Sequence, residues 1–460
     1  MDREHANYRT ANKQLIKEIN MTLVLQMVRE LGPISRADIS KRTGLNPATV
    51  SSHLQLLLEH GVVRETGSGE SSGGRKPTLL ALVPDAYYAV AVDMGTTKVQ
   101  AALVNLAGHV KRKLEIPFGE SRTPQTVLAV MEDAVRQLLN GQSNKSDEEE
   151  GQEQNDENLS DDNGECNDEP HDKGMDTDQH DNTNEKERIL GIGIGFHGLV
   201  DPERGVSLFA PAFQWTDVAV AERFEQSFSL PVIVDNDARA MAFAEKWFGA
   251  AKEIDDFIFL NIGTGVGSGI YAHGRLITGS GFGAGEIGHI PLVNNGIRCY
   301  CGQIGCLHTV ATGPAIERRA RAHMDHQEAS MMRKLADGDP YQVDGALVSH
   351  AARAGDQIAR QILREAGMYI GRALAMAVNL LNPSCIFIGG GVSRARELIL
   401  DSIVQEIKKR SMRQHVENIR VELATFGDHA GVVGAATLVL ADFFQNPLRY
   451  FKQVAKSYHA

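Results

Sequence analysis

Three cysteines and one histidine lie close together in the second half of the sequence. The histidine is His289, and the thiols follow in the segment Cys299-Tyr300-Cys301-Gly302-Gln303-Ile304-Gly305-Cys306. One imidazole and three thiolates match a closed tetrahedral zinc site, and the interleaved glycines let the backbone wrap a metal. The alternative is three free buried cysteines beside a core histidine. Because four protein ligands leave no open coordination position, we predict a structural zinc at His289, Cys299, Cys301 and Cys306.

Three glycine-containing turns beside apolar strands could hold phosphate groups. Glycine lets backbone N–H groups approach oxyanions, threonine hydroxyls add donors, and an acidic residue can hold magnesium through water. Each turn alone is weak evidence, because glycine turns are common in hairpins. Together they make three turns of a phosphate- or nucleotide-binding shape, which could hold ATP and magnesium. Its residues are Asp93, Gly95, Thr96, Thr97 and Lys98 in the first turn, Gly263, Thr264 and Gly265 in the second, and Gly389, Gly390 and Gly391 in the third.

A polar triplet, Asp235-Asn236-Asp237, ends a predicted strand, which is where ligands of α/β folds bind. A carboxylate near a sugar hydroxyl can act as general base in phosphoryl transfer, and a neighbouring amide can anchor hydroxyls. The alternative is that Asp237 only caps the helix predicted from Ala238. Glu286 lies three residues before His289 and would face the same ligand, to which His289 could donate its second ring N–H.

The first 85 residues have the pattern of a winged helix-turn-helix. Three helices are predicted within residues 12–64, with Asn46 as N-cap of the third, and two strands around a Gly/Ser-rich loop at 67–74 form a wing. The alternative is a three-helix bundle for protein contacts. Because the exposed side of the third helix is polar and the wing is basic, we expect DNA contacts. The residues expected to make them are Asn46, Thr49, Ser52, Gln55, Arg75 and Lys76.

The charge of the chain is dominated by one segment. The formal net charge is -12 over 460 residues, but residues 141–188 hold 18 acidic and four basic residues. The net charge therefore excludes no class of partner. The segment lacks apolar periodicity, so we expect a disordered insertion in a surface loop. The apolar stretches are too short to span a bilayer and the start lacks a signal-peptide pattern, so we expect a cytoplasmic protein without membrane contact.

Beyond residue 86 the sequence repeats one pattern. Three strands within residues 88–116 precede a helix at 124–139, and three strands within 257–278 begin a second half that also continues into helices. This order predicts two α/β lobes with a cleft between them. The expected domains are 1–85 for the winged helix, 86–255 for the first lobe and 256–460 for the second lobe with the zinc site.

The segment Gly285-Glu286-Ile287-Gly288-His289, together with the Cys-x-Cys-Gly-x-x-Gly-Cys pattern, resembles the signature of the ROK family. That family groups bacterial sugar kinases with sugar-responsive repressors on an actin-like, duplicated ribonuclease H-like fold. The resemblance covers residue 86 to the C-terminus apart from the acidic insertion, and the winged helix resembles the repressor branch, such as xylose repressors. It implies that Asn236, Asp237, Glu286 and His289 contact a sugar, with Asp237 in the place of the kinases' catalytic base.

Two positions differ from the family pattern. His308 stands where the family usually has Glu, and His197 where kinases often have Pro. We expect His308 to line the sugar site, where imidazole offers one donor and one acceptor instead of a carboxylate. The leading hypothesis is a repressor of carbohydrate-utilisation genes that binds operator DNA as a dimer and a monosaccharide in its cleft. An ATP-dependent sugar kinase with a DNA-binding extension is the alternative, and a protein-interaction adaptor is a third.

Overall fold

The computed structural model describes residues 13–68, 76–142, 188–324 and 330–457. Arg75 and residues 143–187 of the predicted insertion lie outside the described residues. The head is a winged helix-turn-helix, as predicted. It consists of α1 (Lys13–Leu31), β1 (Ile34–Ser35), α2 (Arg36–Thr43), α3 (Pro47–Glu59), β2 (Val63–Ser68) and β3 (Thr78–Leu82), with strand order β1-β3-β2.

Local signals in the sequence explain where the head's helices begin and end. The Ser35 hydroxyl accepts a hydrogen bond from the backbone N–H of Asp38 and caps α2, which ends at Gly44 in the left-handed conformation (φ 71°). The Asn46 side chain accepts from the N–H of Thr49 at 2.8 Å and caps α3. The turn between α2 and α3 is therefore held by one glycine and one cap.

The first lobe contains a five-stranded sheet of order β11-β7-β4-β5-β6. Its strands are β4 (Tyr88–Met94), β5 (Lys98–Asn105), β6 (Val110–Pro117), β7 (Ile189–Phe196) and β11 (Val232–Asn236), and α4 (Pro124–Leu139) and α7 (Asp237–Trp247) belong to the same lobe. A smaller sheet that was not predicted joins β8 (Leu199–Asp201), β9 (Val206–Ala210) and β10 (Trp215–Ala219), followed by α6 (Val220–Phe228).

The second lobe repeats the sheet order as β14-β13-β12-β15-β16. The strands are β12 (Phe257–Ile262), β13 (Val266–Ala272), β14 (Arg275–Leu276), β15 (Cys385–Gly389) and β16 (Arg420–Leu423), and the helices are α8 (His308–Ala311), α9 (Gly313–Met324), α10 (Met331–Leu335), α11 (Gly345–Arg353), α12 (Gln357–Leu381), α13 (Glu397–Arg410) and α14 (Arg413–Val416). A 3-10 turn (Gly391–Ala395) precedes α13, and Arg396 with φ 49° separates the two.

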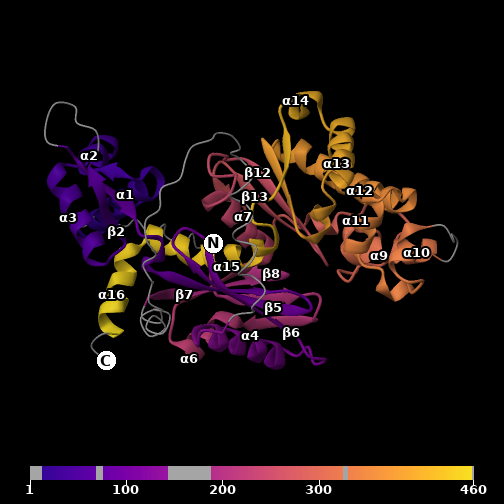
Figure 1. Ribbon diagram of the computed structural model, residues 1–460, viewed down its shortest axis with the longest axis horizontal. Helices are drawn as coiled ribbons and strands as arrows, with labels where there is room; N and C mark the ends of the chain where they lie inside the picture. Colours follow the sequence, from indigo (N-terminus) through magenta and orange to yellow (C-terminus); the bar gives the residue numbers. More distant parts are fainter. Residues whose placement is uncertain (1–12, 69–75, 143–187, 325–329, 458–460) are drawn as a thin grey trace, which may run out of the picture.

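The last two helices return to the first lobe and the head. Helix α15 (Ala430–Gln445) packs on β4, β7 and α7, so close to β7 that a Cβ at Gly193 would collide with the Ala435 carbonyl. Helix α16 (Pro447–Ser457) runs beside α1, and Figure 1 shows α15 and α16 in yellow next to the indigo head. Residues 430–457, which the predicted division assigns to the second lobe, therefore pack on the first lobe and the head.

One apolar cluster joins the head to these helices. It contains Met21 and Val28 of α1 together with Val439, Phe443 and Phe444 of α15. The head is thus seated on the first lobe through a shared core.

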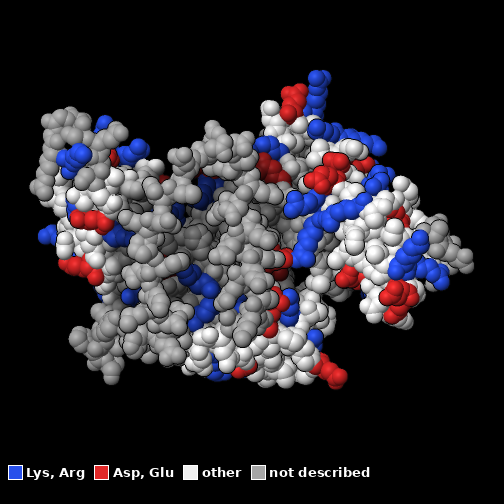
Figure 2. All heavy atoms as spheres, viewed as in Figure 1, with Lys and Arg blue, Asp and Glu red and all other residues white. Residues whose placement is uncertain are grey.

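On the face shown in Figure 2, Lys and Arg are prominent over the part of the second lobe that carries α13 and α14, with Asp and Glu among them, and the head also shows both signs. Among the described helices, none is long and apolar enough to cross a membrane.

Candidate functional site

Acidic side chains lie close together where the parallel strands of the first sheet end, and Asp93 and Asp237 form a buried pair among them. Strands β4, β7 and β11 are parallel, and their register places Asp93 and Asp235 beside Gly195. A Cβ at Gly195 would lie 3.5 Å from Asp93 Oδ1 and 3.6 Å from Asp237 Cα, so this glycine leaves room for both acids. Burial, followed by the Asp237 charge, raises the pKa of Asp93 to about 7, and burial raises the pKa of Asp237 to about 6. The pair can hold a proton near neutral pH.

Asn236 begins α7 and faces the loop after β7. Its Oδ1 accepts from the N–H of Arg239 at 3.0 Å, and its Nδ2 donates to the Gly198 carbonyl at 3.0 Å. Asn236 is therefore the N-cap, and α7 includes Asp237 in its first turn, so the alternative of Asp237 as the cap is wrong. Asp237 Oδ1 accepts from the N–H of Ala238 at 2.8 Å, which orients this carboxylate at the helix start.

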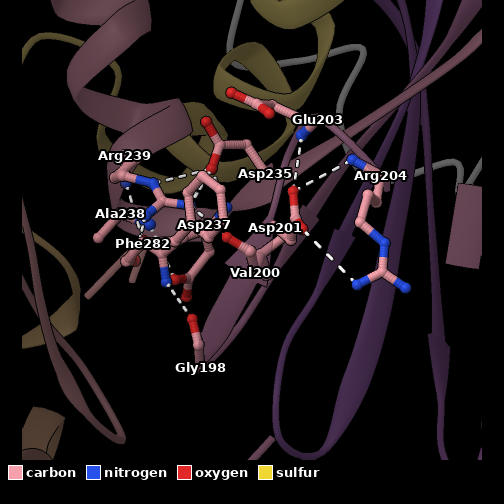
Figure 3. A network of polar contacts seen from close by, with 11 residues as sticks. Gly198, Val200, Asp201, Glu203, Arg204, Asp235, Asp237, Ala238, Arg239 and Phe282 are labelled. Atoms are coloured by element: carbon pink, nitrogen blue, oxygen red, sulfur yellow. Dashed lines mark hydrogen bonds and ion pairs between the residues drawn. The ribbon is translucent and has the colours of Figure 1, made fainter. Parts of the chain in front are cut away.

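Arg239 holds the floor of the site together, although the sequence analysis gave it no role. Its side chain is 2 % exposed and pairs with Asp235, and it donates to the carbonyls of Val200 and Phe282 (Figure 3). Val200 belongs to β8 of the first lobe, whereas Phe282 lies in the loop after β14 of the second. One buried guanidinium thus connects α7 to both lobes.

The three phosphate-type turns lie close together, although one of their predicted residues has its side chain elsewhere. Thr96 Oγ1 lies 3.2 Å from Thr264 Oγ1, so the first and second turns touch across the lobes. Gly390 packs against the end of β12, at Ile262, which brings the third turn next to the second. The exception is Lys98, whose Nζ forms an ion pair with Glu115 on β6. Gly95 and Thr97 belong to the first turn, Gly263 and Gly265 to the second, and Gly389 and Gly391 to the third.

The predicted metal ligands form one cluster. The ligand atoms of His289, Cys299, Cys301 and Cys306 all lie within 4.8 Å of one another. The Cys301 and Cys306 sulfurs are 3.7 Å apart, and His289 Nδ1 is 3.6 Å from the Cys299 sulfur. Tetrahedral zinc with its usual bond lengths requires about 3.8 Å between two sulfurs and about 3.6 Å between sulfur and nitrogen. The four side chains therefore fit a metal ion of that size.

The metal cluster lies beside Glu286 and His308. His289 uses Nδ1 toward the thiols, so Nε2 faces Glu286, whose Oε2 is 3.8 Å away. The His308 ring lies parallel to His289 with centroids 6.1 Å apart, and its Cε1 would be 3.5 Å from a Cβ at Gly265. Burial, followed by the His289 charge, lowers the pKa of His308 to about 4. His308 therefore stands between the metal loop and the second phosphate-type turn.

Sequence reasoning missed Tyr300, which lies beside both histidines. Its hydroxyl lies 3.3 Å from His308 Nδ1, and its ring packs edge-on against both His289 and His308. Its position between two metal ligands was the available signal. His197 packs between Phe196 and Phe213 in the first lobe, where burial lowers the pKa of His197 to about 4.

The predicted DNA-contacting side of α3 is open to solvent. Asn46, Ser52 and Gln55 are exposed, as is Lys76 of the wing, whereas Thr49 is half-buried. Lys41 and Arg42 are also exposed at the end of α2, beside the turn that precedes α3. Phosphate groups next to that turn would meet these two charges.

Comparison with known proteins agrees with both parts of the chain. Residues 177–442 match the ROK family model, and residues 22–64 match the winged helix-turn-helix DNA-binding model. A xylose repressor of Caldicellulosiruptor bescii is 30% identical over 95% of this chain and 99% of its own length. The DNA-binding transcriptional dual regulator NagC of Escherichia coli is 28% identical over 93% of this chain and 94% of its own length.

Solved structures show the same architecture. A ROK family transcriptional regulator, a homologue of the Escherichia coli MLC protein, superimposes with TM-score 0.75 and 27% identity over 96% of this chain and 99% of its own. A ROK family glucokinase from Streptomyces griseus in complex with glucose and AMPPNP reaches TM-score 0.61 and 31% identity over 76% of this chain and 98% of its own. A family model over more than half of the sequence, and a relative that matches nearly all of it, lead to one conclusion: the chain belongs to the ROK family.

Proposed function

We propose that this protein is a sugar-responsive transcriptional repressor of carbohydrate-utilisation genes. The winged helix binds operator DNA, and a monosaccharide binds in the cleft between the lobes. The protein acts as a dimer on a two-fold symmetric operator, in the cytoplasm where that DNA lies. The observation that carries the proposal is the apolar core that the DNA-binding head shares with the first lobe, which provides Asn236 and Asp237 of the proposed sugar site. The xylose repressor and the regulator NagC named above match both parts together.

The sugar site is assigned to five side chains. Asn236 and Asp237 project from the start of α7, and Glu286, His289 and His308 belong to the opposite wall. Asp237 and Glu286 can each accept from sugar hydroxyls, and partial burial, followed by the Asp237 charge, raises the pKa of Glu286. His308 supplies imidazole where relatives with this signature supply a carboxylate, so the ligand presents a different donor and acceptor pattern there.

Zinc is the metal that fits the cluster best, and its role is structural. Three thiolates and one imidazole at these distances suit a closed tetrahedral ion, which would fix the loop that carries Glu286. The DNA contacts are assigned to Asn46, Thr49, Ser52 and Gln55 of α3 and to the wing residues Arg75 and Lys76. Arg75 lies outside the described residues.

Selection of DNA and titration with sugars together test this function. The purified chain selects duplexes from a random library, and its affinity for the selected DNA is then measured with D-xylose, D-glucose or N-acetylglucosamine present. We expect a two-fold symmetric sequence whose binding one sugar weakens. Ser52→Ala with Gln55→Ala should lose sequence preference, whereas Lys76→Ala should reduce affinity for all sequences and lower the salt dependence. Failure to select any sequence would refute the proposal.

A sugar kinase with a DNA-binding extension is the second candidate, because the geometry keeps the catalytic parts together. In this candidate function Asp237 would act as the base, and the turns at Asp93 to Thr97, Gly263 to Gly265 and Gly389 to Gly391 would hold ATP and magnesium. The Thr96 to Thr264 contact counts against it, since in this conformation the two turns meet where phosphates would lie. ATP consumption over the same sugars, with Asp237→Asn as the inactive control, decides between the two.

A further inference from the structure

Arg29 is the point at which the DNA-binding head meets the end of α7. Its guanidinium carbon lies 4.2 Å from the centre of the Trp247 ring and 4.9 Å from that of Phe444. Its Nη2 contacts Glu30 at 3.1 Å, whereas its buried Nη1 has no hydrogen-bond partner among the described residues. Arg29 thus contacts the lobe here through ring faces, against which a planar cation can change position while it keeps its hydrogen bond to Glu30 of the same helix.

Helix α7 connects this point to the proposed sugar site. Asn236 and Asp237 stand at its beginning and Trp247 at its end, so eleven residues span about 16 Å between them. The helix is closely packed along its length. A Cβ at Gly434 of α15 would lie 2.8 Å from the Ala240 carbonyl carbon, and a Cβ at Gly267 of β13 would lie 2.8 Å from Ala238 Cβ. Such packing lets α7 move only as a unit.

The same helix is attached to the second lobe. Arg239 donates to the Phe282 carbonyl, and Gly267 and Gly269 of β13 approach Ala238 and Ala242 closely. A change in the angle between the lobes would therefore displace α7 relative to the first sheet. Its far end would then move Trp247 against Arg29.

We propose that Arg29 and Trp247 are positioning residues that transmit sugar binding to the DNA-binding head. This rests on the proposed function. Sugar at the start of α7 shifts the helix, the Arg29 guanidinium changes its position between the Trp247 and Phe444 rings, and the head is reoriented on the lobe. Two further contacts limit that motion, because the Thr22 hydroxyl donates to the Gln445 carbonyl at 2.7 Å and His60 stacks on Phe451 with centroids 4.0 Å apart.

The main test measures how far sugar changes operator affinity. In the unaltered full chain we expect about 5- to 150-fold, the usual range for coupled sites. Arg29→Met keeps length and loses the cation, so the change should fall below about 2-fold, a limit set well under that range. Its sugar affinity and its operator affinity without sugar should stay within about 2-fold of the parent, since neither site is touched. Arg29→Lys should retain part of the response, because ammonium also binds ring faces.

A matched control separates transmission from general packing. Arg136 lies over Phe228 at 5.3 Å in the first lobe, away from α7 and the head, so Arg136→Met should leave the response unchanged. Full response in Arg29→Met, or an equal loss in Arg136→Met, would overturn the proposal. A loss of sugar-free operator binding in Arg29→Lys would assign Arg29 a purely structural role and also overturn it. No sugar response in the parent refutes the proposed function, and this inference with it.

Fluorescence supplies a readout that does not depend on DNA. The chain has two tryptophans, Trp215 and Trp247. In a Trp215→Phe background, titration with the responding sugar should change Trp247 emission at the midpoint that calorimetry gives for sugar binding. Adding Arg29→Met should remove the change while leaving the calorimetric midpoint. If calorimetry shows sugar binding to the Trp215→Phe chain and the Trp247 emission stays unchanged, the proposal is overturned.

Discussion

The two five-stranded sheets share one strand order but contribute different parts of the site. In the first, Asp93 at the end of β4 stands beside Gly195, and in the second, Asn261 at the end of β12 stands beside Gly389. The first position holds an acid against which Gly431 of α15 packs closely, whereas the second holds an amide against which Gly390 packs. The duplicated scaffold thus gives equivalent positions, and single residues at the strand ends decide which lobe provides carboxylates and which provides turns.

The largest expected effect on stability concerns the close packing of α15 on β7 of the first sheet. Gly193→Ala would place a Cβ against the Ala435 carbonyl of α15, so we expect the free energy of unfolding to fall by about 3 kcal/mol. Gly263→Ala in the second lobe is the matched control, because no atom lies within 4 Å of its Cβ position. It should change stability by less than about 1 kcal/mol. Urea unfolding measures both, and equal losses would show that the close approach of α15 is not the cause.

Removal of one thiol tests the wall that only the second lobe carries. Cys306→Ala should lose bound metal, because three remaining ligands hold zinc far more weakly, and sugar affinity should fall at least about 10-fold as the Glu286 loop is released. Glu286→Gln should lose sugar affinity and keep the metal. Metal analysis and sugar calorimetry on both variants give the answer. Unaltered sugar affinity in metal-free Cys306→Ala would separate the metal from sugar binding.

The acids of the first lobe should give stability a dependence on pH. Folding raises the pKa values of Asp93 and Asp237 from 3.8 to about 7 and about 6, so the folded chain keeps protons that the unfolded chain has released. This contribution is present at low pH and is lost as pH rises from about 4 to about 7. The unfolding free energy of the parent minus that of Asp93→Asn should therefore fall across this range, by up to about 1.4 kcal/mol per pH unit.

His197 acts in the opposite direction over part of that range. Because its pKa is lowered to about 4 in the folded chain, its contribution is present above pH 6.5 and is lost on acidification. The contribution of His197 cancels when the unfolding free energy of Asp93→Asn is subtracted from that of the parent, since both proteins retain His197. Urea unfolding at several pH values measures the difference, and a flat difference would mean that the acids ionise as in the unfolded chain.

The smallest effect separates two helix caps of the same residue type. Asn236→Ser keeps the cap of α7 but loses the hydrogen bond to Gly198, so we expect a loss of about 1 kcal/mol. Asn46→Ser in the head keeps the cap of α3 at an exposed position and should be nearly neutral. Thermal unfolding of both variants measures the contrast. Equal shifts would show that the Gly198 contact contributes nothing.

Strong local signals explain what the sequence predicted correctly. Helix α4 begins and ends where the sequence predicted a helix, at Pro124 and Leu139. The placement of Asp235-Asn236-Asp237 at the end of a strand was also predicted, and β11 ends at Asn236. The thiol cluster followed from ligand type and spacing.

What the sequence could not predict depends on contacts distant in the chain. Strands β8 to β10 are short, and Gln214 and Asp217 with φ of 56° and 50° hide the alternation of β10. The return of α15 to the first sheet has no local signal, since its apolar surface suits either lobe. Arg239 had one available signal, its spacing of four residues from Asp235, but its contact with Phe282 required the folded structure.

The seating of the head on α15 and α16 has a consequence for synthesis. The head leaves the ribosome first, whereas the helices that cover Met21 and Val28 are made last. At usual translation rates the stretch between Val83 and Ala430 takes roughly 20 to 70 s to be made. During that interval a newly made head has its apolar side uncovered, so docking cannot precede completion of the chain. A ribosome that stalls before Ala430 therefore carries a head that lacks the surface that would orient it.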